Sequence, residues 1–212
     1  MNILLACEES QAVTIELRKR GHNAFSCDIL PCSGGYPEWH IQDDAINTAH
    51  DPLRNWDMLI GFPPCTDLAV SGAAWFKQKR ENGSQERAIR FFMKLWGAPV
   101  AMIALENPVN ILGGKYVQTY FPALCEELAL PLKPAQYIEP YFFGDEANKK
   151  TGLWLKNLPK LRPTNMVDGS KYITSPSGKR YPEWCWKTGG GSGHIRSKTF
   201  PGIAKAMAIQ WG

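Results

Sequence analysis

The sequence has little of what marks a membrane, exported or metal-binding protein. No run in its 212 residues approaches the roughly 20 apolar residues that a membrane-spanning helix needs. The N-terminus has no basic segment and meets acid at Glu8 and Glu9, so its first residues predict a buried strand rather than a signal peptide. The six cysteines form no C-x-x-C pair, and the four histidines lack zinc-ligand spacing. We therefore expect a cytoplasmic protein with reduced thiols and no bound metal.

Apolar runs alternate with helical patterns along much of the chain. Strands are expected over residues 3–7, 23–27, 58–62 and 100–105, and helices over 10–20, around 88–96 and over 202–211. Ser10 is expected to cap the first of these helices. Alternation of this kind predicts an α/β fold, a doubly wound, Rossmann-like sheet of mostly parallel strands. The length suits a single domain over residues 1–212.

Charge is divided unevenly along the chain. Residues 1–148 carry a net charge of −6, whereas residues 149–212 hold twelve basic and two acidic residues, a net charge of +10. Aromatic residues are interleaved with this positive charge: Trp154, Tyr172, Tyr181, Trp184 and Trp186. Prolines and a glycine-rich stretch predict that residues 156–198 form an irregular, basic, DNA-contacting insertion in the domain. Basic and aromatic surface is typical of nucleic-acid grooves, although a solvated basic face has the same composition.

Two short motifs place reactive side chains at the ends of expected strands. GFPPC (61–65) follows one apolar run, and LENP (105–108) lies at the end of the next. Because ligands bind outside the carboxyl ends of parallel strands, we expect Cys65, Glu106 and Asn107 to face one pocket. A thiol beside a carboxylic acid suits attack on an electron-poor ring. The residues alone leave open a buried inert cysteine and a structural carboxylate.

The turn after the first expected strand contains no glycine. It is Cys7-Glu8-Glu9-Ser10, where dinucleotide-binding sheets usually have a glycine-rich loop. Asp28 closes the second expected strand, where an acid commonly binds ribose hydroxyl groups. Asp43 and Asp44 are candidates for the adenine edge of the same ligand. Each of these acids has a plainer alternative as a loop cap.

The strand-end motifs resemble those of the DNA cytosine-5 methyltransferase family. GFPPC is similar to the family's nucleophile motif, with Thr66 where a glutamine is usual, and residues 104–109 resemble its Glu-Asn-Val motif. Residues 143–151 look like the strand of its Gln-x-Arg-x-Arg motif, with lysine and threonine at the arginine positions. Residues 201–208 look like its closing helix. The family's Phe-x-Gly-x-Gly loop is absent, and the short chain is similar to compact, phage-encoded members.

The resemblance implies a class I methyltransferase-like fold and methyl transfer from S-adenosylmethionine to DNA. Cys65 would attack carbon 6 of a flipped cytosine, and Glu106, next to Asn107, would act on the activated ring. The residues expected to hold S-adenosylmethionine are Cys7, Glu8, Glu9, Ser10, Asp28, Asp44 and Pro63. The residues expected to contact DNA are Thr66, Ser71, Lys149, Thr151, Arg196 and Lys198.

Three other functions stay open on the sequence alone. One is a related cytosine-5 enzyme with a different donor, and another is a catalytically inactive DNA-binding relative. The third is the same addition chemistry on a free nucleotide, against which the basic, aromatic C-terminal part argues. Little room remains between Pro159 and Ile195 for a target-recognition domain. We therefore expect weak sequence specificity, or a protein partner for target recognition, in a phage- or bacterium-encoded protein.

Overall fold

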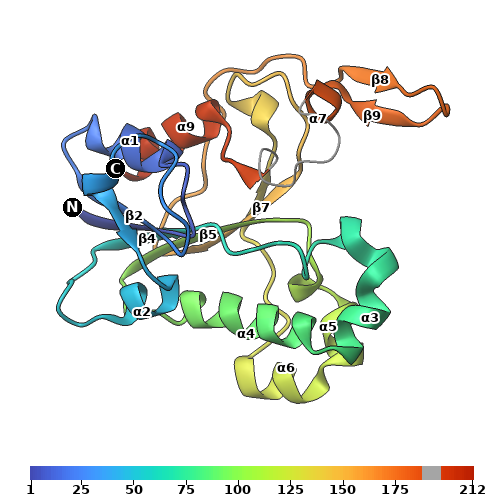
Figure 1. Ribbon diagram of the computed structural model, residues 1–212, viewed down its shortest axis with the longest axis horizontal. Helices are drawn as coiled ribbons and strands as arrows, with labels where there is room; N and C mark the ends of the chain where they lie inside the picture. Colours follow the sequence, from blue (N-terminus) through green and yellow to red (C-terminus); the bar gives the residue numbers. More distant parts are fainter. Residues whose placement is uncertain (188–196) are drawn as a thin grey trace.

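The computed structural model describes residues 1–187 and 197–212, and its centre is a seven-stranded sheet (Figure 1). The strands are β1 Asn2–Ala6, β2 Asn23–Asp28, β3 His40–Gln42, β4 Met58–Gly61, β5 Met102–Pro108, β6 Gln136–Ile138 and β7 Thr151–Lys156. They lie in the order β3-β2-β1-β4-β5-β7-β6. β7 is antiparallel to β5 and β6, and the other paired strands are parallel. The predicted doubly wound, Rossmann-like sheet of mostly parallel strands is confirmed.

The central strands are buried because they are apolar on both faces. Four of the five residues of β1 and all four of β4 are buried, as expected where helices cover both faces of a parallel sheet. The register pairs Gly61 with Ala6 on one side and with Leu105 on the other. A Cβ added at Gly61 would lie only 2.7 Å from Leu105 Cδ2, so glycine is needed for this close packing. The segments that leave β1, β4 and β5 therefore start at the same edge of the sheet.

Helices cover both faces of the sheet (Figure 1). On one face α1 Ala12–Arg18 packs against α9 Pro201–Trp211. The helices of the other face are α2 Ala45–His50, α3 Phe76–Glu81, α4 Ser84–Trp96, α5 Lys115–Tyr120 and α6 Pro122–Leu128. Short 3₁₀ segments are η1 Pro37–Trp39, η2 Val70–Trp75, η3 Ile111–Gly113 and η4 Pro140–Phe142. Each face of the sheet has its own apolar core beneath these helices.

The first helix begins one residue later than a cap at Ser10 would place it. Ser10 does not cap it; the N-cap residue is Gln11, in the left-handed conformation with φ of 58°. The Glu8 carboxylate instead accepts hydrogen bonds from the backbone N–H groups of Val13 (2.7 Å) and Thr14 (3.2 Å). A carboxylate from the preceding turn thus satisfies two N–H groups that have no partner within the helix.

The strand expected over residues 100–105 runs further than predicted. β5 continues to Pro108, so Glu106 and Asn107 belong to it and lie opposite Leu153 and Gly152 of β7. Their backbone is therefore held by a strand pairing rather than by a loop. This pairing gives the carboxylate and the amide fixed positions at the strand end.

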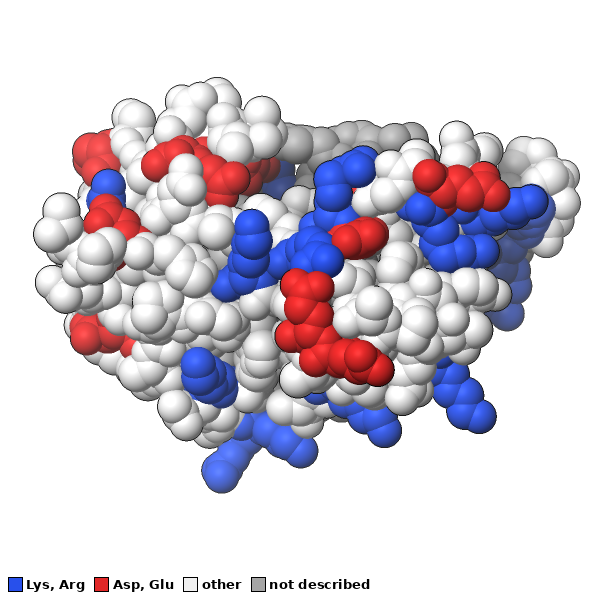
Figure 2. Space-filling view, turned by 90° about the horizontal axis from the view of Figure 1, so that it is seen from below, with Lys and Arg blue, Asp and Glu red and all other residues white. Residues whose placement is uncertain are grey.

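The C-terminal part is less regular than the sheet. The strand expected over residues 143–151 begins only at Thr151, where β7 starts. Beyond β7 the chain forms a hairpin of β8 Tyr172–Thr174 and β9 Arg180–Pro182, followed by α7 Glu183–Lys187 (Figure 1). Seen from below (Figure 2), acidic and basic side chains are interspersed, and several basic groups lie at the end that carries the hairpin. None of the described helices is long and apolar enough to cross a membrane.

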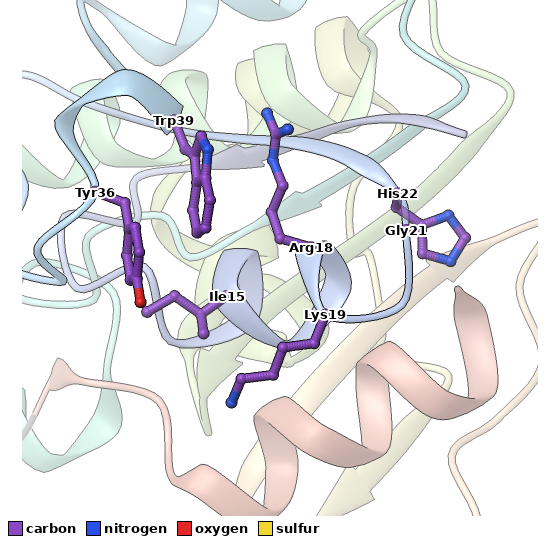
Figure 3. A pocket seen from close by; sticks show the side chains of 7 residues that line it. All are labelled: Ile15, Arg18, Lys19, Gly21, His22, Tyr36 and Trp39. Atoms are coloured by element: carbon purple, nitrogen blue, oxygen red, sulfur yellow. The ribbon is translucent and has the colours of Figure 1, made fainter.

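The connection between β2 and β3 folds against α1. The rings of Tyr36 and Trp39 are stacked with their centroids 4.1 Å apart, and the Arg18 guanidinium lies 5.2 Å from the Trp39 ring (Figure 3). Gln11 holds this connection by donating to Tyr36 O (2.8 Å) and accepting from Tyr36 N (3.1 Å). The result is an open cleft of about 420 Å³ along α1, which shares no residue with the larger cavity at the strand ends.

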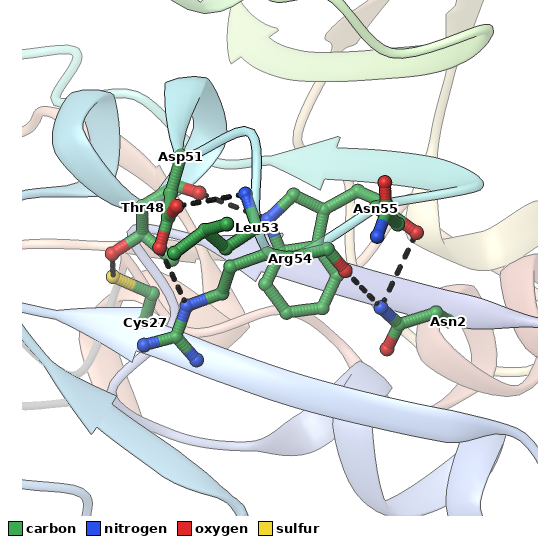
Figure 4. Close-up of polar contacts among 8 residues, drawn as sticks. Asn2, Cys27, Thr48, Asp51, Leu53, Arg54 and Asn55 are labelled. Carbon is green, nitrogen blue, oxygen red and sulfur yellow. Dashed lines mark hydrogen bonds and ion pairs between the residues drawn. The ribbon is translucent and has the colours of Figure 1, made fainter.

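The loop that leads into β4 is tied to the start of β1 (Figure 4). Asn2 Nδ2 donates to the carbonyl oxygens of Arg54 (2.6 Å) and Asn55 (3.4 Å). Trp56 Nε1 donates to Thr48 O at 2.9 Å and anchors the other side of the loop on α2. These contacts set where β4 begins beside β1, and hence where the GFPPC motif leaves the sheet.

Candidate active site

A cavity of about 730 Å³ opens at the carboxyl ends of β1, β2, β4 and β5. Its volume is in the range of small-molecule sites, roughly 300–1,000 Å³. The predicted site residues that line it are Cys7, Glu8, Glu9, Ser10, Asp28, Pro63, Cys65, Thr66, Ser71, Glu106, Asn107, Lys149 and Lys198. The cavity therefore brings both strand-end motifs together with the turn after β1.

The loop that carries Cys65 is held by backbone hydrogen bonds on both sides. Phe62 N donates to Ala6 O at 2.9 Å, where β4 ends. The carbonyl oxygen of Cys65 accepts from Leu68 N (3.0 Å) and Ala69 N (2.8 Å), which makes a tight turn directly after the cysteine. Between these points the two prolines of the motif restrict the backbone φ angles. The thiol is thus presented from a stiff segment.

Asn107 acts on this loop from β5. Its side chain is fully buried, and Nδ2 donates to Pro63 O at 2.7 Å. Its Oδ1 accepts from Asn110 Nδ2 at 3.0 Å. Asn107 therefore joins the two motifs by a direct hydrogen bond and is a positioning residue for the Cys65 loop.

Replacing Asn107 by alanine is expected to lower the free energy of unfolding by about 1–3 kcal/mol, because Pro63 O loses its buried donor. Urea denaturation measures this change. Asn47→Ala, at an exposed position on α2, is the matched control and should have a much smaller effect. Equal stability of the Asn107 variant and the wild type would show that the hydrogen bond does not hold the loop.

Glu106 lies partly buried in the cavity wall. Burial raises the pKa of its carboxyl group, while the Lys149 ammonium and a hydrogen bond with the Thr151 side chain act against this rise. Thr151, predicted as a DNA contact, is only 1% exposed and does not line the cavity. The structure gives it a different position from the one predicted, behind the carboxylate that it helps to hold.

The pKa of the Cys65 thiol is raised as well, first by burial and then by the Glu106 carboxylate. The ammonium groups of Lys149 and Lys79 act in the opposite direction. Lys79 is itself held near the loop by Asp67, at 3.3 Å. The thiolate of Cys65 is therefore disfavoured while Glu106 is charged and becomes easier to form once that carboxyl group takes up a proton.

Lys149→Met is expected to shift the reaction of Cys65 with iodoacetamide to higher pH. Since the Lys149 ammonium lowers the pKa of Cys65, its removal raises that pKa and reduces the thiolate fraction at any given pH. Peptide mass spectrometry over a pH series follows Cys65 separately from the other cysteines. Lys150→Met, which changes a neighbouring lysine of the same cavity, is the control and should leave the profile near that of the wild type. An unchanged profile for Lys149→Met would contradict the electrostatic coupling.

At the other end of the cavity, the turn after β1 is stabilised by its own contacts. Both carboxylate oxygens of Glu8 are engaged by α1, and Thr14 Oγ1 adds a third hydrogen bond of 2.6 Å. Burial raises the pKa of Glu8 to about 7 against the effect of these bonds. Glu9 lies 3.8 Å from Lys198 Nζ, which also donates to Ser33 Oγ at 3.0 Å. Lys198 was predicted as a DNA contact, and in the structure its ammonium group interacts with Glu9 in the turn after β1.

Three further predicted residues, Asp28, Asp44 and Arg196, differ in where they lie relative to the cavity. Asp28 lines the cavity, and its Oδ1 accepts from Leu30 N at 2.9 Å. Asp44 does not line the cavity: it is the N-cap of α2 and accepts from Ile46 N at 2.6 Å. Arg196 lies outside the residues that the structure describes.

The acceptor groups at this end of the cavity suit a ligand with hydroxyl groups and positive charge. Glu9 and Asp28 supply carboxylates, which accept from ribose hydroxyls and attract a sulfonium group. The backbone N–H groups of Val13 and Thr14 in the first turn of α1 are not available to a phosphate, because the Glu8 carboxylate already accepts from them. These residues fit S-adenosylmethionine. Across the described residues, no three His, Cys, Asp or Glu side chains are grouped to hold a metal ion.

Sequence reasoning missed one wall of the cavity. Pro182 of β9 and Trp184 and Cys185 of α7 line it together with Lys150. Trp184 Nε1 donates to Asn148 O at 3.0 Å, which fixes this wall to the segment before β7. The interleaved aromatic and basic residues were the available signal, but nothing local to them indicates that residues 182–185 reach the cavity at the strand ends.

Among known proteins, similarity to this chain was found only with solved structures, and it covers part of each chain. Neither a protein-family model nor a curated protein matches the sequence. One similar solved structure is a protein encoded within an E. coli prophage and assigned as a DNA modification methyltransferase, at 12% identity and a TM-score of 0.47, covering 78% of this chain and 51% of that one. Another is the S. pombe Dnmt2 methyltransferase, at 13% identity and a TM-score of 0.44, covering 76% and 50%. The chain spans about half the length of these two proteins.

Proposed function

We propose that this protein transfers a methyl group to carbon 5 of cytosine in DNA. The observation that carries the proposal is the meeting of the Cys65 thiol and the Glu106 carboxyl group, from neighbouring parallel strands, in one cavity with the turn after β1. Addition to a pyrimidine ring needs a nucleophile, an acid and space for the donor of the transferred group. The resemblance of both motifs to those of cytosine-5 methyltransferases supports the same chemistry.

In this mechanism the thiolate of Cys65 bonds to carbon 6 of a cytosine that lies outside the base stack. Glu106, in its acid form, gives its proton to ring nitrogen 3, so that the electron pair gathers at carbon 5. The raised pKa of Glu106 suits this role because it keeps the acid form closer to neutral pH. After carbon 5 has gained the methyl group, its hydrogen leaves to solvent as a proton. Nitrogen 3 returns its proton to Glu106, and the carbon–sulfur bond breaks to release the thiolate.

S-Adenosylmethionine, when bound, supplies an electrophilic methyl group. Asp28 and Glu9 would accept from its hydroxyl and cationic groups, and Pro63 would separate that part of the cavity from the base. The pKa of Cys7 is raised far above its ordinary value by burial and by Asp28, so its thiol stays protonated and does not compete with Cys65 as a nucleophile.

DNA is the proposed substrate because the cavity opens beside the basic part of the chain. Thr66 and Ser71 are exposed at its rim, next to Cys65. The insertion over residues 156–198 would supply further contacts to the phosphates, which position a nucleic acid without specifying its sequence. The proposal includes a protein partner that would help the protein to recognise its DNA target.

The test is nucleoside mass analysis of DNA incubated with the protein and S-adenosylmethionine. A cytosine mass increased by one methyl group, with no increase for the Cys65→Ser variant, supports the proposal. A different increase would show a cytosine-5 enzyme with another donor. Unchanged nucleosides together with tight DNA binding would show a non-catalytic DNA-binding protein and overturn the proposal.

Asp28→Ala is expected to weaken the binding of S-adenosylmethionine roughly tenfold to a hundredfold, since a hydrogen bond to a charged group contributes about 1.5–3 kcal/mol. Isothermal titration calorimetry measures the affinity. Asp44→Ala removes a carboxylate outside the cavity and is the control: it should affect stability through the α2 cap but not the affinity. Methylation and binding that are normal in Asp28→Ala would rule out the ribose contact, and absence of binding by the wild type would rule out this donor.

A further inference from the structure

The β8–β9 hairpin and α7 present a surface of exposed aromatic and basic side chains. Three rings are exposed on it: Tyr172 by 44%, Tyr181 by 37% and Trp186 by 42%. Lys179 and Arg180 are exposed as well. Because successive residues of a strand point to opposite faces, Tyr172 and Arg180 share one face of the hairpin, with the Arg180 guanidinium 4.8 Å from the centroid of the Tyr172 ring, whereas Lys179 and Tyr181 lie on the other face, beside Trp186. We call these five residues the hairpin surface. Three exposed rings gathered on one short hairpin and helix, together with basic side chains, indicate a binding surface.

The hairpin surface is continuous with the wall of the catalytic cavity. Pro182, the residue after Tyr181, lines the cavity, and so does Cys185, the residue before Trp186. The hairpin is held to the segment before β7, because Asn148 Nδ2 donates to the Tyr172 hydroxyl at 2.5 Å. The hairpin surface therefore borders the cavity that holds Cys65.

We propose that the hairpin surface stacks on unpaired bases, and that the substrate of this protein is single-stranded rather than duplex DNA. The inference rests on the proposed function. The rings of Tyr181 and Trp186 lie 5.8 Å apart and are tilted by 40°, so they are not closed against each other as a parallel stack. Every base has a π-face, and stacking on aromatic side chains together with nearby cations is the usual way to bind single strands without sequence preference.

A DNA duplex has few accessible base faces on which the hairpin surface could stack. In a duplex each base face is covered by its neighbours, and only base edges and phosphates are accessible. Aromatic rings on the hairpin would find no faces to stack on, and only Lys179 and Arg180 would gain contacts. Extrusion of a base from a duplex also requires unstacking and unpairing, which a single strand has largely undergone already.

The experiment measures binding of a fluorescent oligothymidine and of the corresponding dA·dT duplex by anisotropy. Neither probe contains cytosine, and no S-adenosylmethionine is added, so the result does not depend on methyl transfer. The wild type is expected to bind the single strand at least about tenfold more tightly than the duplex. Trp186→Ala is expected to lower single-strand affinity about tenfold, which is about 1.4 kcal/mol, and to leave duplex affinity within twofold.

The controls separate stacking from folding and from general charge. Trp186→Phe keeps a ring and should retain most of the single-strand affinity. Duplex affinity of Trp186→Ala within twofold of the wild type shows that this variant is folded. Tyr120→Ala removes another exposed aromatic ring, 49% exposed on α5, and should leave both affinities unchanged. Duplex binding as tight as single-strand binding, or equal single-strand affinity for Trp186→Ala and wild type, would overturn the inference. Tight single-strand binding without any methylation would instead count against the proposed function alone.

Discussion

Cys65→Ser is expected to reduce methyl transfer by on the order of 10⁴-fold or more, as removal of a catalytic nucleophile does in other enzymes. A serine hydroxyl is a much weaker acid than a thiol and is not ionised near neutral pH, so it is a poor nucleophile in this position. The substitution changes one atom on a partly buried side chain, so the free energy of unfolding should change by less than about 1 kcal/mol. Single-turnover rates with cytosine-containing DNA measure the loss, and urea denaturation measures the stability.

Trapping on DNA that contains 5-fluorocytosine checks the same assignment independently. Fluorine cannot leave carbon 5 as the proton does, so the bond between Cys65 and carbon 6 should persist and retard the protein–DNA complex in a denaturing gel. Cys185→Ser, at another cysteine of the cavity, is the matched control and should trap like the wild type. If Cys65→Ser and wild type trap equally well, another residue is the nucleophile.

Glu106→Gln is expected to slow the single-turnover rate by about 10²–10⁴-fold, the usual contribution of a general acid. The amide has nearly the same shape and still reaches Thr151, but it cannot give a proton to ring nitrogen 3. DNA affinity should therefore change little. Rapid-quench measurements of the rate and anisotropy measurements of binding distinguish the two quantities.

Asp145→Asn is the control for the Glu106 variant. Asp145 is also a partly buried carboxylic acid whose pKa is raised by burial, but it accepts from Gly202 N at the start of α9 and does not line the cavity. Its replacement should leave the chemical rate near that of the wild type. If Glu106→Gln weakens binding and rate by the same factor, Glu106 is a structural residue and the acid must be sought elsewhere.

The main strands could be predicted because their signal is local. β1 and β4 are continuous apolar runs, and burial on both faces requires that composition in a parallel sheet. β3 and β6 have three residues each, too few to show any periodicity. β7 was predicted to begin too early, because its start is decided by pairing of Thr151 with Pro108, which are far apart in the chain. Similarly, no local pattern indicates that the 182–185 segment closes one side of the cavity.

The sequence by itself determined which chemical groups stand at the strand ends: the thiol of Cys65, the carboxyl of Glu106 and the acid at Asp28. Only the tertiary structure decided what each group faces. Glu8 and Asp44 were predicted, like Asp28, to hold the donor. Their carboxylates instead accept hydrogen bonds from N–H groups in the first turns of α1 and α2. The bond from Asn107 to Pro63 joins residues 44 positions apart. The physical reason is that a residue type sets which bonds and charges are available, whereas burial and the choice of partner depend on segments brought together by the fold.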